Sequence, residues 1–497
     1  MRQYTLKNAR AYEKEEGARI DPFERAAFHL TPYTGWTNDP NGFSYYDGLY
    51  HMFYQYYPYE AKWGPMHWGH AVSKDLLHWE YLPCALAPED DYDRNGCFSG
   101  NAITLPDGRH LLMYTSVKLG RLVNGKRSER QQQCIAIGDG KNYKKYKNNP
   151  VIQTALLPKG ASKRDFRDPK VWRGSDGIYR ALVASRDENG NGQLLLFKSG
   201  DAFLWHYEKV FLANEGRFGK MWECPDFFAL GRQHVLLVSP QDMLPERFEY
   251  HNGNGTLCLS GDYDEKTDTF SWTHDQSVDY GIDFYAPQTV KAPDGRQIMI
   301  GWMQNWDAVS IHTPEERKWA GQMSLPRELT LKRGRLYQKP VKELDALRKN
   351  KVVHKNVRVS ELPQFLKGVK GRTVDLLVTL HPQQKRYDLR KLSIRFAEKG
   401  DLYTSVSFRP HEYTLKLDRK HSGSRRAVIH QRRCMVDSAD GSLKLRIILD
   451  RYSVEVFIGN GEQVMSAGLY TDLDAEQISF LADGNATIDV TKYDLVM

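Results

Sequence analysis

The stretch GWTNDPNGFSYYDGLYHMFYQ (residues 35–55) contains a pattern that recurs through the first two thirds of the chain. A motif with one acidic residue, Asp39, is followed by a short β-rich run, an Asp-Gly pair at 47–48 and a second β-rich run over 50–55. Asp-Gly between two such runs predicts a β-hairpin, because glycine tolerates the positive φ that a tight hairpin turn needs. The stretch therefore predicts a unit of motif, strand, turn and strand.

This unit recurs five times at intervals of roughly sixty residues, as expected of a repeat architecture. The turns lie at 47–48, 107–108, 176–177 and 294–295 (Asp-Gly) and at 230–231 (Leu-Gly), and the predicted strands cover 50–55, 110–115, 178–184, 234–238 and 297–302. Eight positions before the Asp of each Asp-Gly turn stand Asp39, Ser99, Asp168 and Ala286; Glu223 stands eight positions before Gly231, one position shifted. Hairpin repeats of this length are typical of propeller blades, so the sequence predicts a five-bladed β-propeller over residues 27–338. The alternative is a chance agreement of turn positions.

The remaining residues predict a second all-β domain. Residues 341–349 have the apolar spacing of a short helix, which predicts a partly helical linker over 339–357. Alternating strands are predicted at 373–380, 392–396, 403–408, 443–449 and 453–458, with Gly, Asp and Asn at the breaks. Short strands with regular turns predict a β-sandwich over residues 358–497, while residues 1–26 form a separate N-terminal segment.

Composition excludes several classes of protein. Lys and Arg number 70 against 62 Asp and Glu, a net charge of +8 that is spread along the chain without a groove-reading motif, so no nucleic-acid partner is expected. No apolar run reaches the length of a membrane span, and residues 1–20 lack the apolar run of a secretory signal. The six cysteines form no C-x-x-C pair, which favours reduced thiols and a cytoplasmic location. The sequence does not predict an oligomeric state.

A metal site is not expected either. His67 and His70 could be metal ligands, but no further His or Cys in the sequence supports them, so core histidines are the favoured interpretation. From these residues we expect no metal site.

Three motifs place an acidic residue at the repeated position: NDPNG around Asp39, RDP around Asp168 and WECP around Glu223. Each has an alternative interpretation, respectively a surface turn, an exposed ion pair and a strand-edge glutamate. Three carboxylates that converge on one axis repel one another, a cost tolerated chiefly where function demands it. Glycoside cleavage has that demand, since one carboxylate attacks the anomeric carbon and another gives its proton to the leaving oxygen.

The neighbours of these residues suggest how they are tuned. Trp222 and Cys224 flank Glu223, and apolar surroundings would raise its pKa as a general acid requires. Arg167 would hold Asp168 ionised, and Asp168 could bond sugar hydroxyls. Candidate sugar contacts offer amides, hydroxyls, acids or ring faces, although blade packing is the alternative for each aromatic one. They are Trp36, Asn38, Gln55, Trp63, Phe98, Ser99, Arg167, Asp279, Asp283 and Trp302.

The motifs together resemble those of glycoside hydrolase family 32, which includes invertases, levanases, inulinases and sucrose-6-phosphate hydrolases. They occur in family order: WTNDPNG (36–42), FSG (98–100), RDP (167–169), ECP (223–225), DYGIDFYAPQ (279–288) and GWM (301–303). SVEVFIGNGE (453–462) looks like part of the C-terminal sandwich of that family. The N-terminal segment and GPMHWGHA (64–71) look most like the intracellular bacterial members.

The resemblance implies a five-bladed propeller with a β-sandwich, retention of anomeric configuration, and no metal or cofactor. It implies that Asp39 is the nucleophile, Asp168 the transition-state stabiliser and Glu223 the acid/base. By position, Asn38, Gln55, Trp63, Ser99 and Arg167 match residues that bind the fructosyl unit in similar enzymes.

Three functions stay open at this point. The first is a β-fructofuranosidase acting on sucrose, short fructo-oligosaccharides or sucrose 6-phosphate. The second is a fructosyltransferase, which uses the same covalent intermediate and differs in whether water or a sugar hydroxyl accepts the fructosyl group. The third is a sugar-binding propeller without catalysis.

Overall fold

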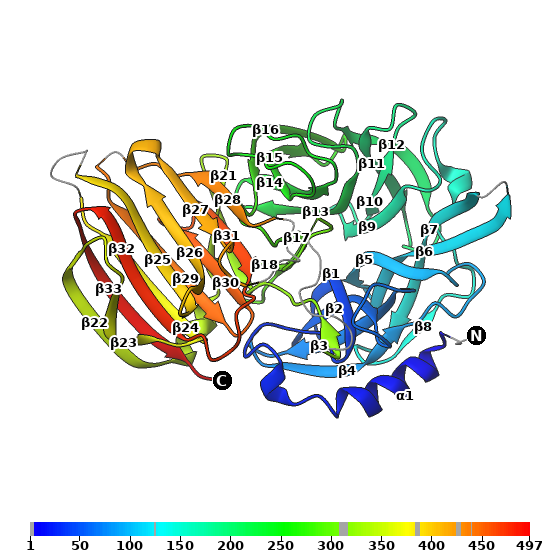
Figure 1. The fold of residues 1–497 in the computed structure, drawn as a ribbon. Coiled ribbons are helices and arrows are strands. Elements are labelled where there is room, and N and C mark those ends of the chain that lie inside the picture. Colours follow the sequence, from blue (N-terminus) through cyan, green and yellow to red (C-terminus); the bar gives the residue numbers. More distant parts are fainter. Residues whose placement is uncertain (1–3, 124–125, 308–316, 383–387, 424–428, 439) are drawn as a thin grey trace.

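A computed structural model describes residues 4–123, 126–307, 317–382, 388–423, 429–438 and 440–497 of the chain. The described residues are predominantly β-strand and form two parts (Figure 1). The N-terminal part contains five mainly antiparallel sheets of four or five strands, and the C-terminal part contains two six-stranded sheets packed face to face. The prediction of an all-β chain that ends in a sandwich is confirmed.

The five N-terminal sheets follow one another along the chain. The first contains β1 (Gly35–Tyr46), β2 (Leu49–Tyr57), β3 (His67–Ser73), β4 (Trp79–Leu86) and β19 (Trp319–Ala320), which pairs with β1 in parallel. The second contains β5 (Gly96–Thr104), β6 (His110–Val123), β7 (Lys126–Gly138) and β8 (Tyr143–Lys145). The third contains β9 (Phe166–Arg173), β10 (Tyr179–Arg186), β11 (Gly192–Ser199) and β12 (His206–Ala213). The fourth contains β13 (Trp222–Leu230), β14 (Gln233–Pro240), β15 (Leu257–Asp264) and β16 (Thr269–Ser277). The fifth contains β17 (Tyr285–Lys291), β18 (Gln297–Trp302), β20 (Arg327–Lys332) and β21 (Arg335–Pro340).

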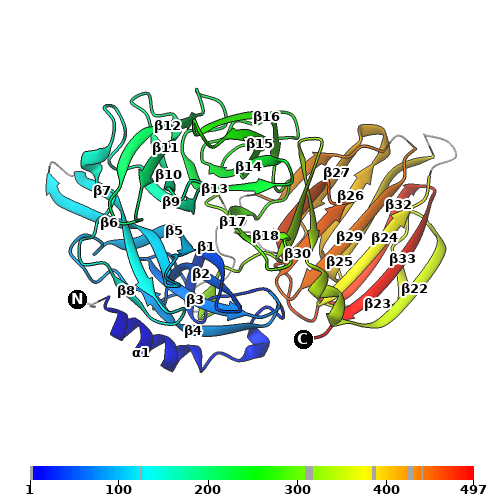
Figure 2. The same cartoon turned by 180° about the vertical axis from the view of Figure 1, so that it is seen from behind.

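The first strands of these sheets lie at the centre of the N-terminal part (Figures 1 and 2). They touch in cyclic order: β1 contacts β5, β5 contacts β9, β9 contacts β13, β13 contacts β17, and β17 contacts β1 again. The predicted hairpin strands overlap β2, β6, β10, β14 and β18, which are the second strands. The repeated motif residues therefore belong to the innermost strand of each sheet.

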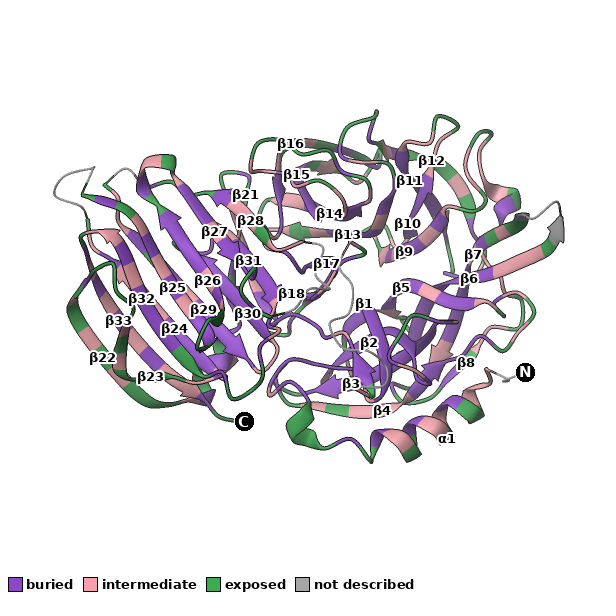
Figure 3. Ribbon diagram, in the orientation of Figure 1, coloured by how far each residue is buried: buried purple, intermediate pink, exposed green. Residues whose placement is uncertain are grey.

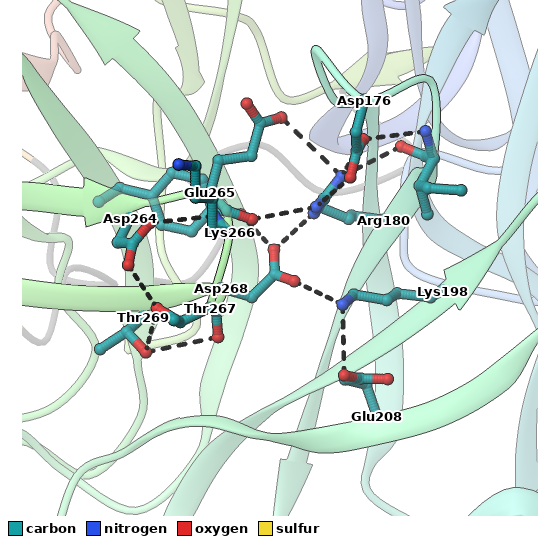
Figure 4. Close-up of polar contacts among 12 residues, drawn as sticks. Asp176, Arg180, Lys198, Glu208, Asp264, Glu265, Lys266, Thr267, Asp268 and Thr269 are labelled. Atoms are coloured by element: carbon teal, nitrogen blue, oxygen red, sulfur yellow. Dashed lines mark hydrogen bonds and ion pairs between the residues drawn. The ribbon is translucent and has the colours of Figure 1, made fainter.

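Charged side chains join neighbouring sheets away from the centre. Figure 4 shows the contact between the third and fourth sheets, where Arg180 of β10 pairs with Asp268 in the β15–β16 turn. Lys198 of β11 reaches the second oxygen of Asp268, with Nζ at 2.6 Å, and also pairs with Glu208 of β12. Arg180 and Asp268 are both buried, so each buried charge is compensated by the other. Asp176, from a predicted hairpin turn, pairs with Arg180 as well.

Sequence reasoning missed the helix α1 (Leu6–Gly17). Its N-cap is Thr5, whose hydroxyl accepts from the backbone N–H of Asn8. The helix packs against β4, and its buried Glu13 accepts from the backbone N–H of Cys84. No helix among the described residues is long and apolar enough to cross a membrane.

The sandwich begins earlier than the sequence suggested. A 3-10 helix at Lys342–Leu347 follows the fifth sheet, and β22 (Arg348–Val359) starts inside the segment expected to be a linker. One sheet orders β22 beside β33 (Ala486–Leu495), β24 (Val374–Leu380), β29 (Leu443–Asp450), β30 (Ser453–Ile458) and β31 (Gln463–Gly468). The other orders β23 (Gln364–Lys370), β32 (Gln477–Gly484), β25 (Leu389–Lys399), β26 (Leu402–Arg409), β27 (Thr414–Asp418) and β28 (Gln431–Met435). Three further short 3-10 helices lie at Pro22–Glu24, Thr154–Leu156 and Pro410–Glu412.

Burial follows this arrangement, with the inner strands buried and edge strands such as β12, β16 and β22 partly exposed (Figure 3). The contact between the five sheets and the sandwich contains a group of buried charged residues that we call the interface cluster: His29, Asp279, Arg327, Asp450 and Glu455. His29 lies 2.8 Å from Asp450 and 3.1 Å from Glu455, whereas Arg327 lies 2.6 Å from Glu455 and 3.0 Å from Asp279.

Candidate active site

A cavity of about 360 Å³ opens where the first strands converge. Nine of the predicted site residues line it: Asn38, Asp39, Gln55, Trp63, Phe98, Ser99, Arg167, Asp168 and Glu223. Six lining residues were not predicted: Glu129, Gln131, Arg164, Asp165, Gln241 and Trp306. Asp39, Asp168 and Glu223, which we call the pocket trio, come from β1, β9 and β13 of three different sheets.

A β-bulge at the same place in every first strand turns these side chains inward. The register with the second strand shifts between Thr37 and Pro40, Phe98 and Gly100, Arg167 and Lys170, Glu223 and Asp226, and Tyr285 and Gln288. A bulge re-aims a side chain and is common beside active sites. Asp168 has a φ of 62° within its bulge, a conformation that a non-glycine residue adopts only when its surroundings impose it. Asp39, Ser99, Asp168 and Ala286 therefore lie in bulges, whereas Glu223 pairs with Ser239 and directly precedes the bulge of β13.

Asp39 is buried and fixed by polar donors. Ser99 Oγ donates to its Oδ2 at 2.7 Å, Asn38 Nδ2 donates to its Oδ1 at 3.1 Å, and Cys224 Sγ lies 3.5 Å from Oδ2. Burial and the charge of Glu223 raise the pKa of Asp39 to about 6, although these hydrogen bonds oppose the rise. Asp39 is thus held in one orientation and is ionised at neutral pH.

Asp168 lies beside Asp39 and shares Cys224 with it. The backbone N–H of Cys224 donates to Asp168 Oδ2 at 3.0 Å, and the Cys224 thiol lies 3.6 Å from the same oxygen. Burial raises the pKa of Asp168 most; the Arg167 charge, 3.9 Å away, opposes it, and the charges of Glu223 and Asp39 add to it. Arg167 was expected to hold Asp168 ionised, but its charge does not outweigh burial and the other two acids, so the pKa of Asp168 is raised.

Glu223 has a different environment from the apolar one expected from Trp222 and Cys224. Three polar groups reach its carboxyl: Arg167 Nε at 3.0 Å from Oε1, Gln241 Nε2 at 2.9 Å from Oε2, and the Tyr285 hydroxyl at 2.7 Å from Oε2. The two flanking residues do not surround this carboxyl with apolar groups: the Cys224 thiol lies against Asp39 and Asp168, and the Trp222 side chain points elsewhere. Trp222 donates its Nε1–H to the carbonyl oxygen of Phe218.

Trp36 and Trp302 lie behind the pocket and do not line it. Trp36 Nε1 donates to Asn38 Oδ1 at 2.9 Å and so orients the amide that reaches Asp39. Trp302 is buried, with its ring 6.0 Å from that of Trp36 and 5.0 Å from that of Trp306. These two predicted sugar contacts are supports for pocket residues in the structure.

Asp279 and Asp283 also lie outside the pocket lining, at the sandwich contact. Asp279 pairs with Arg327 and accepts from the Ser466 hydroxyl at 2.7 Å. Asp283 pairs with Arg419 of the sandwich and accepts from the backbone N–H of Gly468 at 2.7 Å. Their carboxylates are already bonded within the protein, so this geometry does not favour the predicted sugar contacts.

The two histidines considered as metal ligands are core residues. His67 is buried with Nδ1 2.8 Å from the carbonyl oxygen of Pro65, and His70 Nε2 lies 3.0 Å from Nδ1 of His51. Burial lowers the pKa of His67 to about 3, so its imidazole is neutral at physiological pH. In the described part of the chain no three His, Cys, Asp or Glu side chains are grouped as metal ligands.

Comparison with known proteins identifies the family. Residues 29–340 match the Glycosyl hydrolases family 32 N-terminal domain, and residues 343–495 match the Glycosyl hydrolases family 32 C terminal. A raffinose invertase of Escherichia coli is 38% identical over 93% of this chain and 93% of its own length. A sucrose-6-phosphate hydrolase of Escherichia coli is 35% identical over 93% of this chain and 92% of its own length.

A solved structure agrees. A mutant of the Bombyx mori GH32 β-fructofuranosidase BmSUC1, in complex with sucrose, superposes with a TM-score of 0.83 at 33% identity, covering 99% of this chain and 98% of that one. The family matches together span nearly the whole chain and include every residue of the pocket trio. The chain belongs to glycosyl hydrolase family 32 and is a glycosidase.

Proposed function

We propose that the protein is a β-fructofuranosidase that releases terminal β-D-fructosyl units from sucrose and short fructo-oligosaccharides with retention of configuration. The observation that carries the proposal is the convergence of three carboxylates from three sheets on one cavity. The names of the relatives, an invertase, a sucrose-6-phosphate hydrolase and a β-fructofuranosidase, support the substrate class.

Asp39 is the nucleophile in this proposal. Its carboxylate is held by Ser99 and Asn38, so it meets the anomeric carbon C2 of the fructosyl unit without first having to be ordered. The bond from C2 to the leaving oxygen breaks as a bond from C2 to an Asp39 oxygen forms, giving a covalent fructosyl-enzyme.

Glu223 supplies and recovers the proton. It gives a proton to the leaving oxygen in the first step and takes one from the attacking water in the second, when the ester to Asp39 breaks. The Tyr285 hydroxyl lies 2.7 Å from Glu223 and 3.0 Å from the carbonyl oxygen of Ser239. Its single hydrogen can point to ionised Glu223, or to Ser239 while protonated Glu223 donates to the Tyr285 oxygen, so Tyr285 accommodates both states.

Asp168 stabilises the transition state in this proposal. The cationic character that develops at C2 is favoured by a nearby carboxylate, and the buried setting strengthens that interaction. Arg167 lies between Asp168 and Glu223 and limits the repulsion between them.

The test is fructose release from sucrose and 1-kestose by the wild type, Asp39→Ala and Glu223→Gln. We expect release by the wild type and almost none by either variant. Proton NMR during the first turnovers should show the β-anomer of fructose before mutarotation. Release that persists in Asp39→Ala, or an α-anomer formed first, would contradict the mechanism, and fructosyl oligosaccharides that dominate at high sucrose would indicate a transferase.

We further propose that the five N-terminal sheets are the blades of a five-bladed propeller spanning about residues 27–338, followed by the sandwich, whose first strand β22 begins at Arg348. The cyclic contacts of the first strands support this architecture. We also propose a cytoplasmic location, since all six cysteines are free and buried, as is common in a reducing compartment.

A further inference from the structure

The cavity that holds the pocket trio has an excess of negative charge. Its described lining contains five carboxylate residues and two arginines: Asp39, Glu129, Asp165, Asp168, Glu223, Arg164 and Arg167. A group that enters this cavity therefore meets more acidic than basic side chains. The charge of the substrate must matter here, because the walls of a cavity focus the field of such groups.

Arg167 is fully engaged by the protein. Its guanidinium lies 3.0 Å from Glu223, 3.3 Å from Asp165 and 3.9 Å from Asp168. It also donates to the side-chain oxygen of Gln131 at 3.3 Å. An anionic substrate group would have to compete with three carboxylates for this one cation.

Arg164, at the outer edge of the cavity, is paired as well. Its Nε lies 3.3 Å from Glu129 Oε2, and Glu129 is largely buried while the Arg164 side chain is 75% exposed. The exposed cation is screened by water, whereas the Glu129 side chain, which also lines the cavity, is only 19% exposed. Among the described lining residues, neither arginine is without a carboxylate partner.

The rest of the outer edge suits an uncharged sugar. Trp63 and Trp306 line the cavity with 48% and 39% of their surfaces exposed, and Trp63 meets Phe98 edge-on at 6.2 Å. Exposed aromatic faces can pack against the apolar face of a sugar ring. Glu129 and Asp165 can accept hydrogen bonds from its hydroxyls, which a phosphate dianion cannot donate.

We propose that this pocket selects β-fructosides whose leaving group is a neutral sugar and discriminates against a phosphorylated leaving group, with Glu129 as a specificity-determining residue. The inference rests on the proposed β-fructofuranosidase function. A phosphate ester carries roughly one and a half to two negative charges near neutral pH, and it would enter a cavity whose described lining has five carboxylates and only two arginines. Such repulsion is an effective way to reject a competing substrate.

The experiment compares three substrates that differ at one oxygen of the glucosyl unit. Sucrose has a free hydroxyl there, sucrose 6-phosphate a charged substituent, and raffinose a neutral sugar on the same oxygen. Fructose release is measured as kcat/KM for each with the full chain. We expect sucrose and raffinose to be cleaved and sucrose 6-phosphate to be at least about tenfold poorer than sucrose, with the difference shrinking as salt screens the charges.

Two variants test whether the charge of Glu129 causes the discrimination against sucrose 6-phosphate. Glu129→Gln removes one negative charge at nearly constant shape, and we expect the ratio of kcat/KM for sucrose 6-phosphate to that for sucrose to rise about fivefold. Glu412→Gln is the matched control: Glu412 belongs to the sandwich, its side chain is 48% exposed, and it pairs with Arg409. The control should leave the ratio unchanged.

The possible results distinguish a wrong inference about substrate charge from a wrong proposal of β-fructofuranosidase function. Efficient cleavage of sucrose 6-phosphate, or no change of the ratio in Glu129→Gln, overturns the inference and leaves the β-fructofuranosidase intact. Poor cleavage of both raffinose and sucrose 6-phosphate shows exclusion by size and also overturns it. Fructose release from none of the three overturns the proposed function and the inference together.

Discussion

The pocket trio and the interface cluster both bury three carboxylates, and they differ in the cations that accompany them. The pocket trio has Arg167 alone, whereas the interface cluster has both Arg327 and His29. In the pocket, burial and mutual repulsion raise the pKa of Asp39 to about 6 and raise that of Asp168.

The interface cluster reverses this balance for two of its acids. Burial would raise the pKa of Asp450 and of Glu455. At Asp450 the bond and charge of His29, with the backbone N–H groups of Ala27 and Phe28, outweigh burial and hold the pKa below its usual value. At Glu455 the charge of Arg327 and the bond and charge of His29 do the same. Of the three acids in that cluster, only Asp279 has a raised pKa, again from burial. Carboxylates with too few neighbouring cations therefore occur in the pocket, where the chemistry needs them. Carboxylates compensated by cations occur where the two parts of the protein meet.

The largest effect is expected from a substitution in the pocket trio. Asp39→Asn should lower kcat by about ten-thousand-fold or more, because an amide cannot form the covalent intermediate. The free energy of unfolding should stay the same or rise, since the change removes a repelled, desolvated carboxylate. Initial rates on sucrose and urea denaturation check both. Asp107→Asn, at an exposed hairpin turn, is the control; a large loss of stability in Asp39→Asn would mean that the pocket trio holds the fold together.

The next largest effect is expected from a substitution in the interface cluster. Glu455→Gln should lower the free energy of unfolding by about 3–5 kcal/mol, because it leaves Arg327 and His29 buried with too little negative charge. The kcat of the folded variant should remain close to wild type, since the cluster does not line the pocket. Urea denaturation measures the change beside Glu412→Gln. A loss below about 1 kcal/mol would show that the cluster is no more than the equivalent of a surface ion pair.

The stability that the interface cluster contributes should depend on pH through His29. Burial lowers the pKa of His29, but its bonds to Asp450 and Glu455 outweigh that and raise the pKa to about 9, against about 6.5 in an unfolded chain. Protonated His29 thus stabilises the fold fully below about pH 6.5, and about 3 kcal/mol of stability is lost as pH rises through 9.

Thermal unfolding at about pH 6 and about pH 9.5 should show this loss in the wild type and much less of it in His29→Gln. His206→Gln, a change at an exposed histidine, should keep the wild-type dependence. An identical pH dependence in His29→Gln would mean that other groups cause it.

The two regions also differed in how far the sequence predicted them. The pocket trio was predictable because its members recur at nearly the same distance before successive hairpin turns. Asp39 and Asp168 proved to lie in a bulge of their first strand, whereas Glu223, one position shifted, directly precedes the bulge of β13. Glu129 and Trp306 were missed because they lie on β7 and after β18, where no repeated motif marks them.

The interface cluster had no such signal. His29 and Glu455 are far apart in the chain, and only the docking of the sandwich brings them together. Asp279 and Asp283 were assigned to sugar binding because they precede β17 in a motif-rich segment, yet their partners Arg327 and Arg419 come from β20 and the sandwich. A single sequence does not show which surface a buried carboxylate will meet.

The smallest effect is expected from removing the hydrogen bond between Ser99 and Asp39 in the pocket. Ser99 Oγ donates to Asp39 Oδ2 at 2.7 Å, a bond that lowers the pKa of Asp39 against the stronger effects of burial and Glu223. Ser99→Ala removes this donor, so the pKa of Asp39 should rise further, and a higher pH should be needed to ionise the nucleophile. The acid limb of the profile of kcat/KM against pH should therefore move upward by about half a unit to one unit, equivalent to about 1 kcal/mol.

The matched control is Ser116→Ala. Ser116 is a buried serine whose hydroxyl donates to the backbone oxygen of Gln132, and its substitution should leave the acid limb in place. Because the carboxylates titrate together, the shift belongs to the pocket as a whole. A limb that stays fixed in Ser99→Ala while activity falls would mean that Ser99 serves the substrate and not the nucleophile.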